Sequence, residues 1–341
     1  MPRLIKGEGS IKEIAFEIKK AGYSAVFLIC GKHFQKENGF SFLQEFKVTN
    51  FIKSGANVEE AEAEKAFNEF CLGSKQAIVA IGGGSVIDIA KYIIYKLAAS
   101  SLSIPFFAAV PTTAGSGSEA THFAVIYKGK KKISLAHDSL LPQLAILDPR
   151  LTYSLPSYQT AVSGMDVLAQ AIESYWNVNV TNESRKYATE SILIWKDFFI
   201  KAVTTPHPAA REGMLQAAHF AGKAINITRT TGPHALSYYL TSNFNIAHGQ
   251  AVALFLPIFF YYNKPSTDLL QLLGVKNANE AVSWIQQKMK EASLAIMLTE
   301  LGIEKEKVLD ELLNEVNEER FANNPEKFDR KKLKQLIKEY L

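Results

Sequence analysis

The stretch AIVAIGGGSVIDIAK, residues 77–91, joins a short apolar run to a helical pattern through a glycine-rich turn. Its first five residues are all apolar, which is typical of a strand that is buried on both faces of a sheet. Residues 82–85 (Gly-Gly-Gly-Ser) end this run, and a helix is expected from Val86 onward. A buried strand that leads through a tight turn into a helix is the building unit of parallel α/β sheets. The stretch therefore predicts an α/β domain.

The same alternation extends over the first half of the chain. Three further apolar runs occupy residues 25–30, 104–110 and 144–147. An amphipathic stretch rich in Glu and Ala, residues 58–70, precedes the glycine turn. Strands that alternate with helices in this way are typical of βαβ units. We therefore expect a mainly parallel sheet.

The second half of the chain has a different character. Long helical patterns cover residues 159–175, 182–203 and 209–227, and the tail from Asn277 onward is helical and highly charged. A chain of 341 residues also exceeds the usual size of a single hydrophobic core. We therefore expect an α/β domain over residues 1–153, an all-α domain over residues 154–341, and an active site in a cleft between the two.

The composition excludes several classes of protein. Apolar residues make up 47% and charged residues 21%, which is ordinary for a globular protein. Charges of both signs are interspersed and the formal net charge of +4 is small, which argues against the clustered basic face of a nucleic-acid-binding protein. The longest apolar stretch, residues 251–262, is interrupted by Pro257 and is too short to span a bilayer. The N-terminus has no apolar core of signal-peptide length, and Cys30 and Cys71 imply no disulfide framework. We expect a cytoplasmic protein that binds neither membrane nor nucleic acid.

The glycine turn, residues 82–85, can bind a phosphate. Glycines let the backbone approach a phosphate closely, and the helix N-terminus that follows supplies unpaired N–H groups. The pattern departs from the G-x-G-x-x-G motif of ordinary dinucleotide sites, so a tight structural connection explains it equally well. Asp88, near the start of the helix, can also be explained as a residue that the helix dipole favours.

A second polar turn follows the third apolar run. The segment PTTAGSGSE, residues 111–119, interleaves hydroxyl residues with glycine. Open α/β sheets bind ligands at the carboxyl ends of their strands, so this threonine turn suits a diphosphate or a ribose. A polar surface loop is the alternative for any one such stretch. Two such turns at successive strand ends favour a nucleotide.

Four polar residues of the second half are candidate metal ligands. Asp166 and Gln170 are four residues apart in a helical pattern, so they point in the same direction from adjacent turns. His234 and His248 lie further along the chain. A carboxylate and two imidazoles can hold a divalent transition metal, and an amide oxygen can complete the set weakly. A lone histidine is more often a core or surface residue than a ligand, so spacing alone does not connect these segments.

Taken together, these segments resemble the iron-containing (group III) alcohol dehydrogenase family. The glycine turn with Asp88 and Lys91 resembles the family's GGGSxxDxAK signature, and residues 111–119 resemble its PTTAGTGSE signature. Residues 147–149 and 164–175 are similar to its later landmarks. The resemblance implies an N-terminal α/β nucleotide-binding domain and a C-terminal all-helical domain that carries the metal.

The resemblance also implies the ligand set. Fourteen residues separate His234 from His248, which is the family's spacing for its second and third histidine ligands. The family binds Fe²⁺ or Zn²⁺ through an aspartate, here Asp166, and three histidines. The remaining histidine position falls on Gln170, and Tyr238 occupies a place where many relatives have a histidine assigned to proton relay. The phenol of Tyr238 can replace that histidine or shape the pocket.

The reaction implied by the resemblance is the reduction of a small aldehyde to a primary alcohol by NADPH or NADH, with the metal polarising the carbonyl. Gly31 takes the place of an aspartate that holds the ribose of NAD in many relatives, and Lys32 follows it, which favours NADPH. A homodimer or a higher homo-oligomer is expected. The residues expected to bind the cofactor are Gly31, Gly83, Gly84, Ser85, Asp88, Thr112, Thr113, Ser116 and Lys132.

The substrate has one clue in the sequence. Arg229 precedes His234 by five residues, and an arginine there can pair with an anionic substrate tail or be a solvated loop residue. Together with residues 170–176 and 233–239, it resembles the subgroup that reduces phosphonoacetaldehyde to 2-hydroxyethylphosphonate. Two alternatives stand beside this prediction. One is a non-redox enzyme of the dehydroquinate synthase type on the same fold, and the other is a catalytically inactive binding protein.

Overall fold

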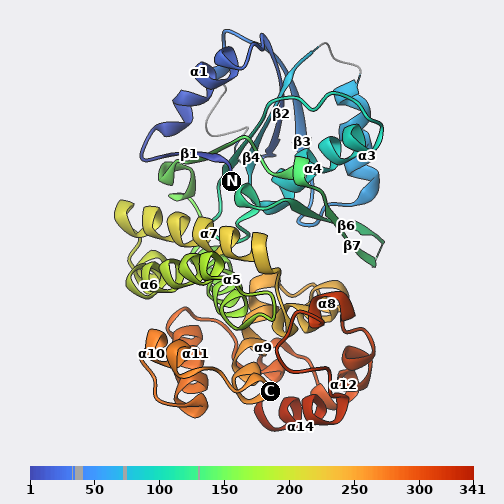
Figure 1. Ribbon diagram of the computed structural model, residues 1–341. Helices are drawn as coiled ribbons and strands as arrows, with labels where there is room; N and C mark the ends of the chain where they lie inside the picture. The colour runs from blue at the N-terminus through green and yellow to red at the C-terminus, as the bar shows by residue number, and fades with distance from the viewer. Residues whose placement is uncertain (33, 35–40, 72–74, 130) are drawn as a thin grey trace. The chain divides into compact units, whose positions relative to one another are not determined.

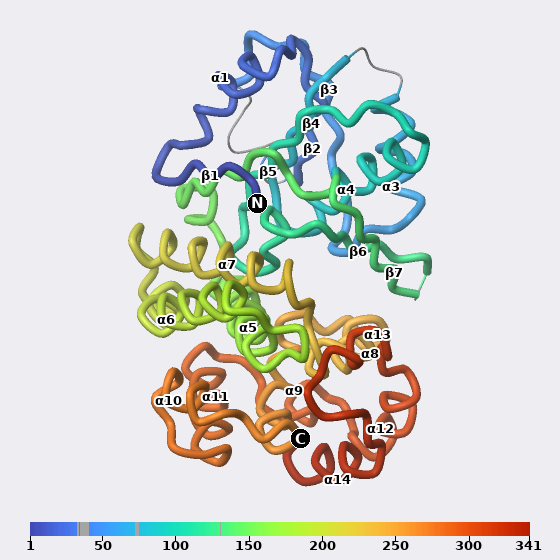
Figure 2. The backbone as a smooth tube through the Cα atoms, in the orientation of Figure 1, coloured from blue at the N-terminus to red at the C-terminus, as the bar shows by residue number. Residues whose placement is uncertain are grey.

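The computed structural model of the chain (Figure 1) describes residues 1–32, 34, 41–71, 75–129 and 131–341. The chain divides into two compact units, Met1–Ser154 and Leu155–Leu341. Figure 2 traces the backbone through both, from blue at the N-terminus to red at the C-terminus.

The first unit is built on a six-stranded parallel sheet with the order β1-β8-β5-β4-β2-β3. Its strands are β1 (Arg3–Lys6), β2 (Ala25–Gly31), β3 (Lys47–Lys53), β4 (Ala77–Gly82), β5 (Phe107–Pro111) and β8 (Leu144–Leu147). Its helices are α1 (Glu13–Lys20), α3 (Glu60–Cys71) and α4 (Gly84–Ala99). The antiparallel hairpin of β6 (Phe123–Lys128) and β7 (Lys131–Ala136) completes the unit.

Helices cover both faces of this sheet. Phe27 and Ile29 of β2 belong to the cluster that contains α3 and α4, whereas Val26 and Leu28 belong to the cluster that contains α1. Because successive side chains of a strand point to opposite faces, β2 and β4 are buried on both sides. The continuous apolar runs of the sequence are explained by this double burial, and the expected parallel sheet is confirmed.

The two edge strands carry no such signal. β1 and β3 stand at the ends of the strand order, and most of their side chains are exposed or half-buried. Their sequences, RLIK and KVTNFIK, mix apolar and polar residues. A strand that is paired on one side only does not need a continuous apolar run. Neither β1 nor β3 was therefore predicted from the sequence, and the β6–β7 hairpin was not predicted either.

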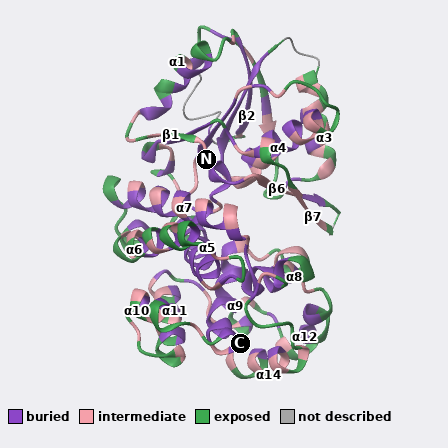
Figure 3. Cartoon of the chain, in the orientation of Figure 1, coloured by how far each residue is buried: buried purple, intermediate pink, exposed green. Residues whose placement is uncertain are grey.

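The second unit is all-helical, as expected. Its helices are α5 (Ser157–Trp176), α6 (Asn182–Thr204), α7 (Pro208–Thr228), α8 (Gly232–Phe244), α9 (His248–Asn263), α10 (Thr267–Leu273), α11 (Ala278–Glu291), α12 (Lys305–Asn314), α13 (Glu318–Phe321) and α14 (Arg330–Tyr340). Helices α5 and α9 are buried over most of their length and form the core of this unit (Figure 3). Among the described residues, no helix has both the length and the apolar character needed to cross a membrane.

Candidate active site

Three of the four expected metal ligands meet in the helical unit. Asp166 comes from the middle of α5, His234 from the first turn of α8, and His248 is the first residue of α9. The Nε2 atom of His234 lies 3.1 Å from Asp166 Oδ1, and Nε2 of His248 lies 4.0 Å from the same oxygen. One donor atom from each of the three residues fits within a span of 4.8 Å. Ligand atoms lie about 2.0–2.2 Å from a bound Zn²⁺, so these donors can face one ion after small side-chain rotations.

A close helix contact sets the position of His248. A Cβ atom on Gly249 would lie 1.9 Å from the backbone oxygen of Val162, so α5 and α9 touch where the glycine has no side chain. This contact brings the start of α9 against the helix that carries Asp166. The backbone approach therefore helps to assemble ligands from separate helices.

Glu173 contacts the ring nitrogen of His234 that faces away from Asp166, a role that was not predicted from the sequence. Its side chain is fully buried, and Oε2 contacts Nδ1 of His234. Its other oxygen accepts hydrogen bonds from the Thr231 amide (2.8 Å) and the Thr231 hydroxyl (3.0 Å). Because Nδ1 is held by Glu173, Nε2 is directed to the cluster. Glu173 follows Asp166 by seven residues, or two helical turns, which is the signal in the sequence that places both on one face.

The electrostatics of the cluster favour a bound cation. Burial would lower the pKa of His234, but Glu173 and Asp166 outweigh it and raise this pKa to about 9. Burial would raise the pKa of Asp166, but hydrogen bonds from His234 and Gln170 and the charge of His248 keep it below its ordinary value. The site therefore stabilises positive charge next to two buried carboxylates, Asp166 and Glu173.

Gln170 fits the role of a fourth ligand. It lies one turn beyond Asp166 on α5, is buried, and hydrogen-bonds to that aspartate. Its Oε1 atom accepts no hydrogen bond from the residues that the structure describes. Buried polar atoms are nearly always paired, so an orphaned carboxamide oxygen next to two imidazoles and a carboxylate fits a metal ion.

Tyr238 lies beside the cluster. Its ring stacks on His248 with centroids 6.1 Å apart, and its phenol accepts a hydrogen bond from Arg320. Burial raises the pKa of the phenol. Arg320 is on α13, far from Tyr238 in the sequence, and no local pattern connects the two residues.

In the α/β unit, the glycine and threonine turns lie against each other. The amide of Thr112 donates a 3.0 Å hydrogen bond to the Gly82 carbonyl. A Cβ atom on Gly83 would lie 3.3 Å from Thr113 Oγ1, and one on Gly84 would lie 2.6 Å from Ser116 Oγ. The predicted cofactor-binding residues of the two turns therefore lie together at the carboxyl ends of β4 and β5. They are Gly83, Gly84, Ser85, Thr112, Thr113 and Ser116.

Asp88 lies behind these turns. Its two carboxylate oxygens accept hydrogen bonds from the Ser118 hydroxyl (2.8 Å) and the Val125 amide (3.0 Å). Lys132, on β7, lies close enough for its charge to oppose the rise that burial causes in the Asp88 pKa. Through Ser118, Asp88 therefore supports the threonine turn from behind, and its role towards the cofactor stays a prediction.

Lys91, which the sequence analysis used only to recognise a motif, completes this support. It is fully buried, and its Nζ donates hydrogen bonds to Thr121 Oγ1 (2.9 Å) and the Phe123 carbonyl (2.8 Å). Burial lowers the pKa of Lys91 to about 8, although Asp88 and Glu119 oppose the shift. Lys91 thus connects α4 to the segment that leads into β6.

Gly31 ends β2 at the same edge of the sheet. Cys30 pairs with Ile81 in the parallel register of β2 and β4, so Gly31 and Gly82 both follow aligned residues. Among the residues that the structure describes, none comes within 4 Å of a Cβ atom added to Gly31, and the neighbouring Lys32 is exposed.

Comparison with known proteins identifies the family of the chain. Residues 2–149 match the family described as iron-containing alcohol dehydrogenase, and residues 160–341 match the C-terminal part of that family. The solved sulfoacetaldehyde reductase of Bifidobacterium kashiwanohense, in complex with NAD⁺, superposes with a TM-score of 0.91 at 26% identity. This superposition covers 99% of this chain and 96% of that one.

Curated relatives match part of the chain. The probable alcohol dehydrogenase EutG of Escherichia coli is 37% identical over 203 residues, 55% of this chain and 51% of the relative. The phosphonoacetaldehyde reductase of Streptomyces viridochromogenes is 33% identical over 207 residues, 54% of this chain and 52% of the relative. The chain spans about half the length of these relatives. Because the C-terminal match alone covers more than half of the 341 residues, the chain belongs to the iron-containing alcohol dehydrogenase family.

Proposed function

We propose that the protein reduces a small aldehyde to a primary alcohol with a nicotinamide cofactor, in a reversible reaction that needs a divalent metal ion. The observation that carries this proposal is the cluster of Asp166, His234 and His248 beside the orphaned oxygen of Gln170. A metal bound there would supply Lewis acidity to the oxygen of the substrate, and the nicotinamide would supply or accept the hydride.

The chain's own residues have separate tasks in this proposal. Asp166, Gln170, His234 and His248 hold the metal, and Glu173 fixes the ring of His234 so that Nε2 stays available. The glycine and threonine turns bind the cofactor through backbone groups and hydroxyls. We favour NADPH as the cofactor. An aspartate at the end of β2 would repel a 2′-phosphate, and this chain has Gly31 and the cation of Lys32 there instead.

Our best candidate substrate is phosphonoacetaldehyde. The relative of that name from Streptomyces viridochromogenes and the sulfoacetaldehyde reductase from Bifidobacterium kashiwanohense both support an aldehyde with an acidic group at its other end. We take Fe²⁺ and Zn²⁺ as the candidate metals. Carboxamide oxygen is a weaker ligand than imidazole, so we expect lower metal affinity than for a site with three histidines.

The test is elemental analysis of anaerobically purified protein together with an aldehyde panel under NADH and NADPH. We expect one equivalent of metal per chain, and oxidation of NADPH by aldehydes that stops when the metal is removed. Oxidation that continues at the same rate in metal-free protein would contradict the metal role. If no aldehyde oxidises either cofactor with iron, zinc or manganese present, a dehydroquinate synthase-type enzyme or an inactive binding protein replaces the proposal.

A further inference from the structure

Two arginines gather next to Tyr238, and the proposed reaction as described so far uses neither. Arg320 is only 5% exposed and donates a hydrogen bond to the Tyr238 phenol. Arg229 follows the last residue of α7 and is half-buried. Asn323, just after α13, donates a hydrogen bond to the carbonyl of Thr230, so the helix that carries Arg320 lies against the turn that carries Arg229. Burial lowers the pKa of Arg229, and the like charge of Arg320 lowers it further, whereas Glu319 opposes the shift. Like charges that are partly removed from water repel unless an anion lies between them.

The position of Arg320 is fixed by hydrogen bonds on both sides of α13. Before the helix, the Asn317 amide donates to the Ala235 carbonyl at 3.3 Å. After it, Nδ2 of Asn323 donates to the Thr230 carbonyl at 3.1 Å. Figure 2 shows α13 beside α8, the helix that carries His234 and Tyr238. The short helix is therefore docked on the same turn from which Arg229 projects.

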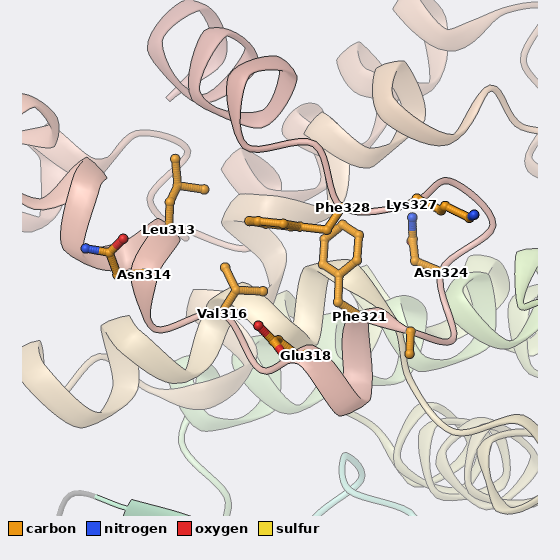
Figure 4. Close-up of a pocket in the computed structure, with 9 residues that line it drawn as sticks. Leu313, Asn314, Val316, Glu318, Phe321, Asn324, Lys327 and Phe328 are labelled. Atoms are coloured by element: carbon orange, nitrogen blue, oxygen red, sulfur yellow. The ribbon is translucent and has the colours of Figure 1, made fainter.

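Phe321 anchors α13 from another direction. It is 3% exposed, and its ring centroid lies 6.0 Å from that of Phe259 and 5.2 Å from that of Phe328. Phe321 and Phe328 line a pocket of about 290 Å³ with Leu313 and Val316 (Figure 4). Because consecutive helical residues point in different directions, Phe321 packs into this apolar region while Arg320 reaches Tyr238.

Arg229 has a strained backbone that its neighbours hold in place. Its φ of 68° and ψ of −179° fall in a region that is populated almost only by glycine. Its carbonyl accepts hydrogen bonds from Asn177 Nδ2 (3.2 Å) and Thr228 Oγ1 (3.0 Å), and its amide donates to Ile225 (2.8 Å). Such strain persists where the surrounding structure fixes it, and it is concentrated at functional sites.

We propose that Arg229 and Arg320 form a subsite that binds the acidic group of the substrate while its carbonyl faces the cluster of Asp166, His234 and His248. This inference rests on the proposed aldehyde reduction and assigns its substrate class, a short aldehyde with an oxyacid anion at the far end. The Tyr238 ring lies between Arg320 and His248, so only a short spacer separates anion from carbonyl. Guanidinium groups match the oxygens of phosphonate, sulfonate and carboxylate in planar, bidentate contacts.

The experiment compares kcat/KM for phosphonoacetaldehyde, sulfoacetaldehyde, succinic semialdehyde and neutral propanal in metal-loaded enzyme. Binding of methylphosphonate, measured by calorimetry, is a second readout that does not need turnover. The variants are Arg320→Met and Arg229→Gly. Glycine is chosen at position 229 because it adopts the positive φ of this residue without strain. Arg185→Met is the matched control, because Arg185 is an exposed arginine of the same unit that lies over the Tyr175 ring.

We expect each site variant to lower kcat/KM for the acidic aldehydes about 10- to 100-fold more than for propanal, the size of a lost charge-assisted hydrogen bond. Methylphosphonate binding should weaken in parallel, and Arg185→Met should change neither readout. The three acidic aldehydes distinguish which oxyacid the pair prefers. An equal loss for acidic and neutral aldehydes, with unchanged methylphosphonate binding, would overturn the inference.

Failure of the proposed function has a different outcome. If the wild type reduces no aldehyde, methylphosphonate binding still tests the arginine pair by itself. Binding that is lost in Arg320→Met and retained in Arg185→Met would support the anion subsite without the reductase activity. If the wild type does not bind methylphosphonate and reduces propanal faster than every acidic aldehyde, the subsite is wrong and the reductase remains.

Discussion

In each unit of this protein, one fully buried charged residue supports the candidate site. The two supporting residues differ in the sign of their charge and in what they hold in place. In the helical unit, Glu173 contacts the ring of His234, so the support acts on a side chain that is a candidate metal ligand. In the α/β unit, Lys91 joins α4 to the Thr121–Phe123 segment, so the support acts on the backbone of a turn. A metal site needs side-chain donors in fixed directions, whereas a phosphate site needs correctly placed N–H groups. The difference predicts that the two sites fail separately.

The largest expected effect is the loss of metal from His248→Ala. The variant removes a proposed ligand, so the dissociation constant for Zn²⁺ should rise by more than about 100-fold. This exceeds the loss of about 10- to 100-fold that is typical when a residue that only orients a ligand is changed. Metal content by elemental analysis and Zn²⁺ titration measure it. NADPH affinity should stay within about twofold, because the nucleotide turns belong to the other unit. A variant that retains its full metal content would show that His248 is not a ligand.

The next effect tests Glu173 as the support of His234. Glu173→Gln keeps an oxygen for the Thr231 amide but loses the charge that faces Nδ1 of His234. Metal affinity should fall about 10- to 100-fold. Glu183→Gln, at an exposed glutamate of the same unit, is the matched control and should leave the affinity unchanged. Equal affinities for the two variants would mean that Glu173 serves packing alone.

Sequence alone predicted the parts of both sites that depend on local patterns. The apolar runs that became β2, β4 and β8 are buried on both faces, so each run marks its strand directly. The candidate metal ligands Asp166, His234 and His248 lie on three helices and were proposed through motifs, because no spacing rule joins residues that only the fold brings together. Arg320 had no signal at all, since its contact with Tyr238 depends on how α13 docks.

An intermediate effect is expected when the nucleotide turn is crowded. Gly84→Ala places a Cβ atom 2.6 Å from Ser116 Oγ, so the glycine and threonine turns must move apart. NADPH binding should weaken about tenfold, equivalent to about 1.4 kcal/mol, with metal retention unchanged. The cause is tested by a double-mutant cycle with Ser116→Gly. If the clash is responsible, Gly84→Ala will weaken binding less in the Ser116→Gly background, and strictly additive losses would exclude the clash.

The last prediction sharpens the comparison of the two supports through pH, by a change in stability that is small over any narrow pH interval. The pKa of Lys91 is about 8 in the folded protein and 10.5 ordinarily, so the unfolded chain binds more protons at this residue between these two pH values. Stability therefore rises with pH in that window, by up to about 1.4 kcal/mol per pH unit from this group. Relative to Lys91→Met, the wild type should become steadily more stable from pH 8 toward pH 10.

Labelling of Cys30 can follow unfolding of the α/β unit alone. Cys30 is buried in β2, and burial raises its pKa to about 11, so it reacts slowly until the sheet opens. In a Cys71→Ser background, which removes the exposed thiol, the urea concentration at half-labelling reports the stability of this unit. Lys96→Met, on the same helix, is the control, because Lys96 is only partly buried. The difference in stability between the wild type and this variant should not rise with pH as it does for Lys91→Met. If the wild type and Lys91→Met keep a constant difference across this range, Lys91 is not a buried cation of shifted pKa.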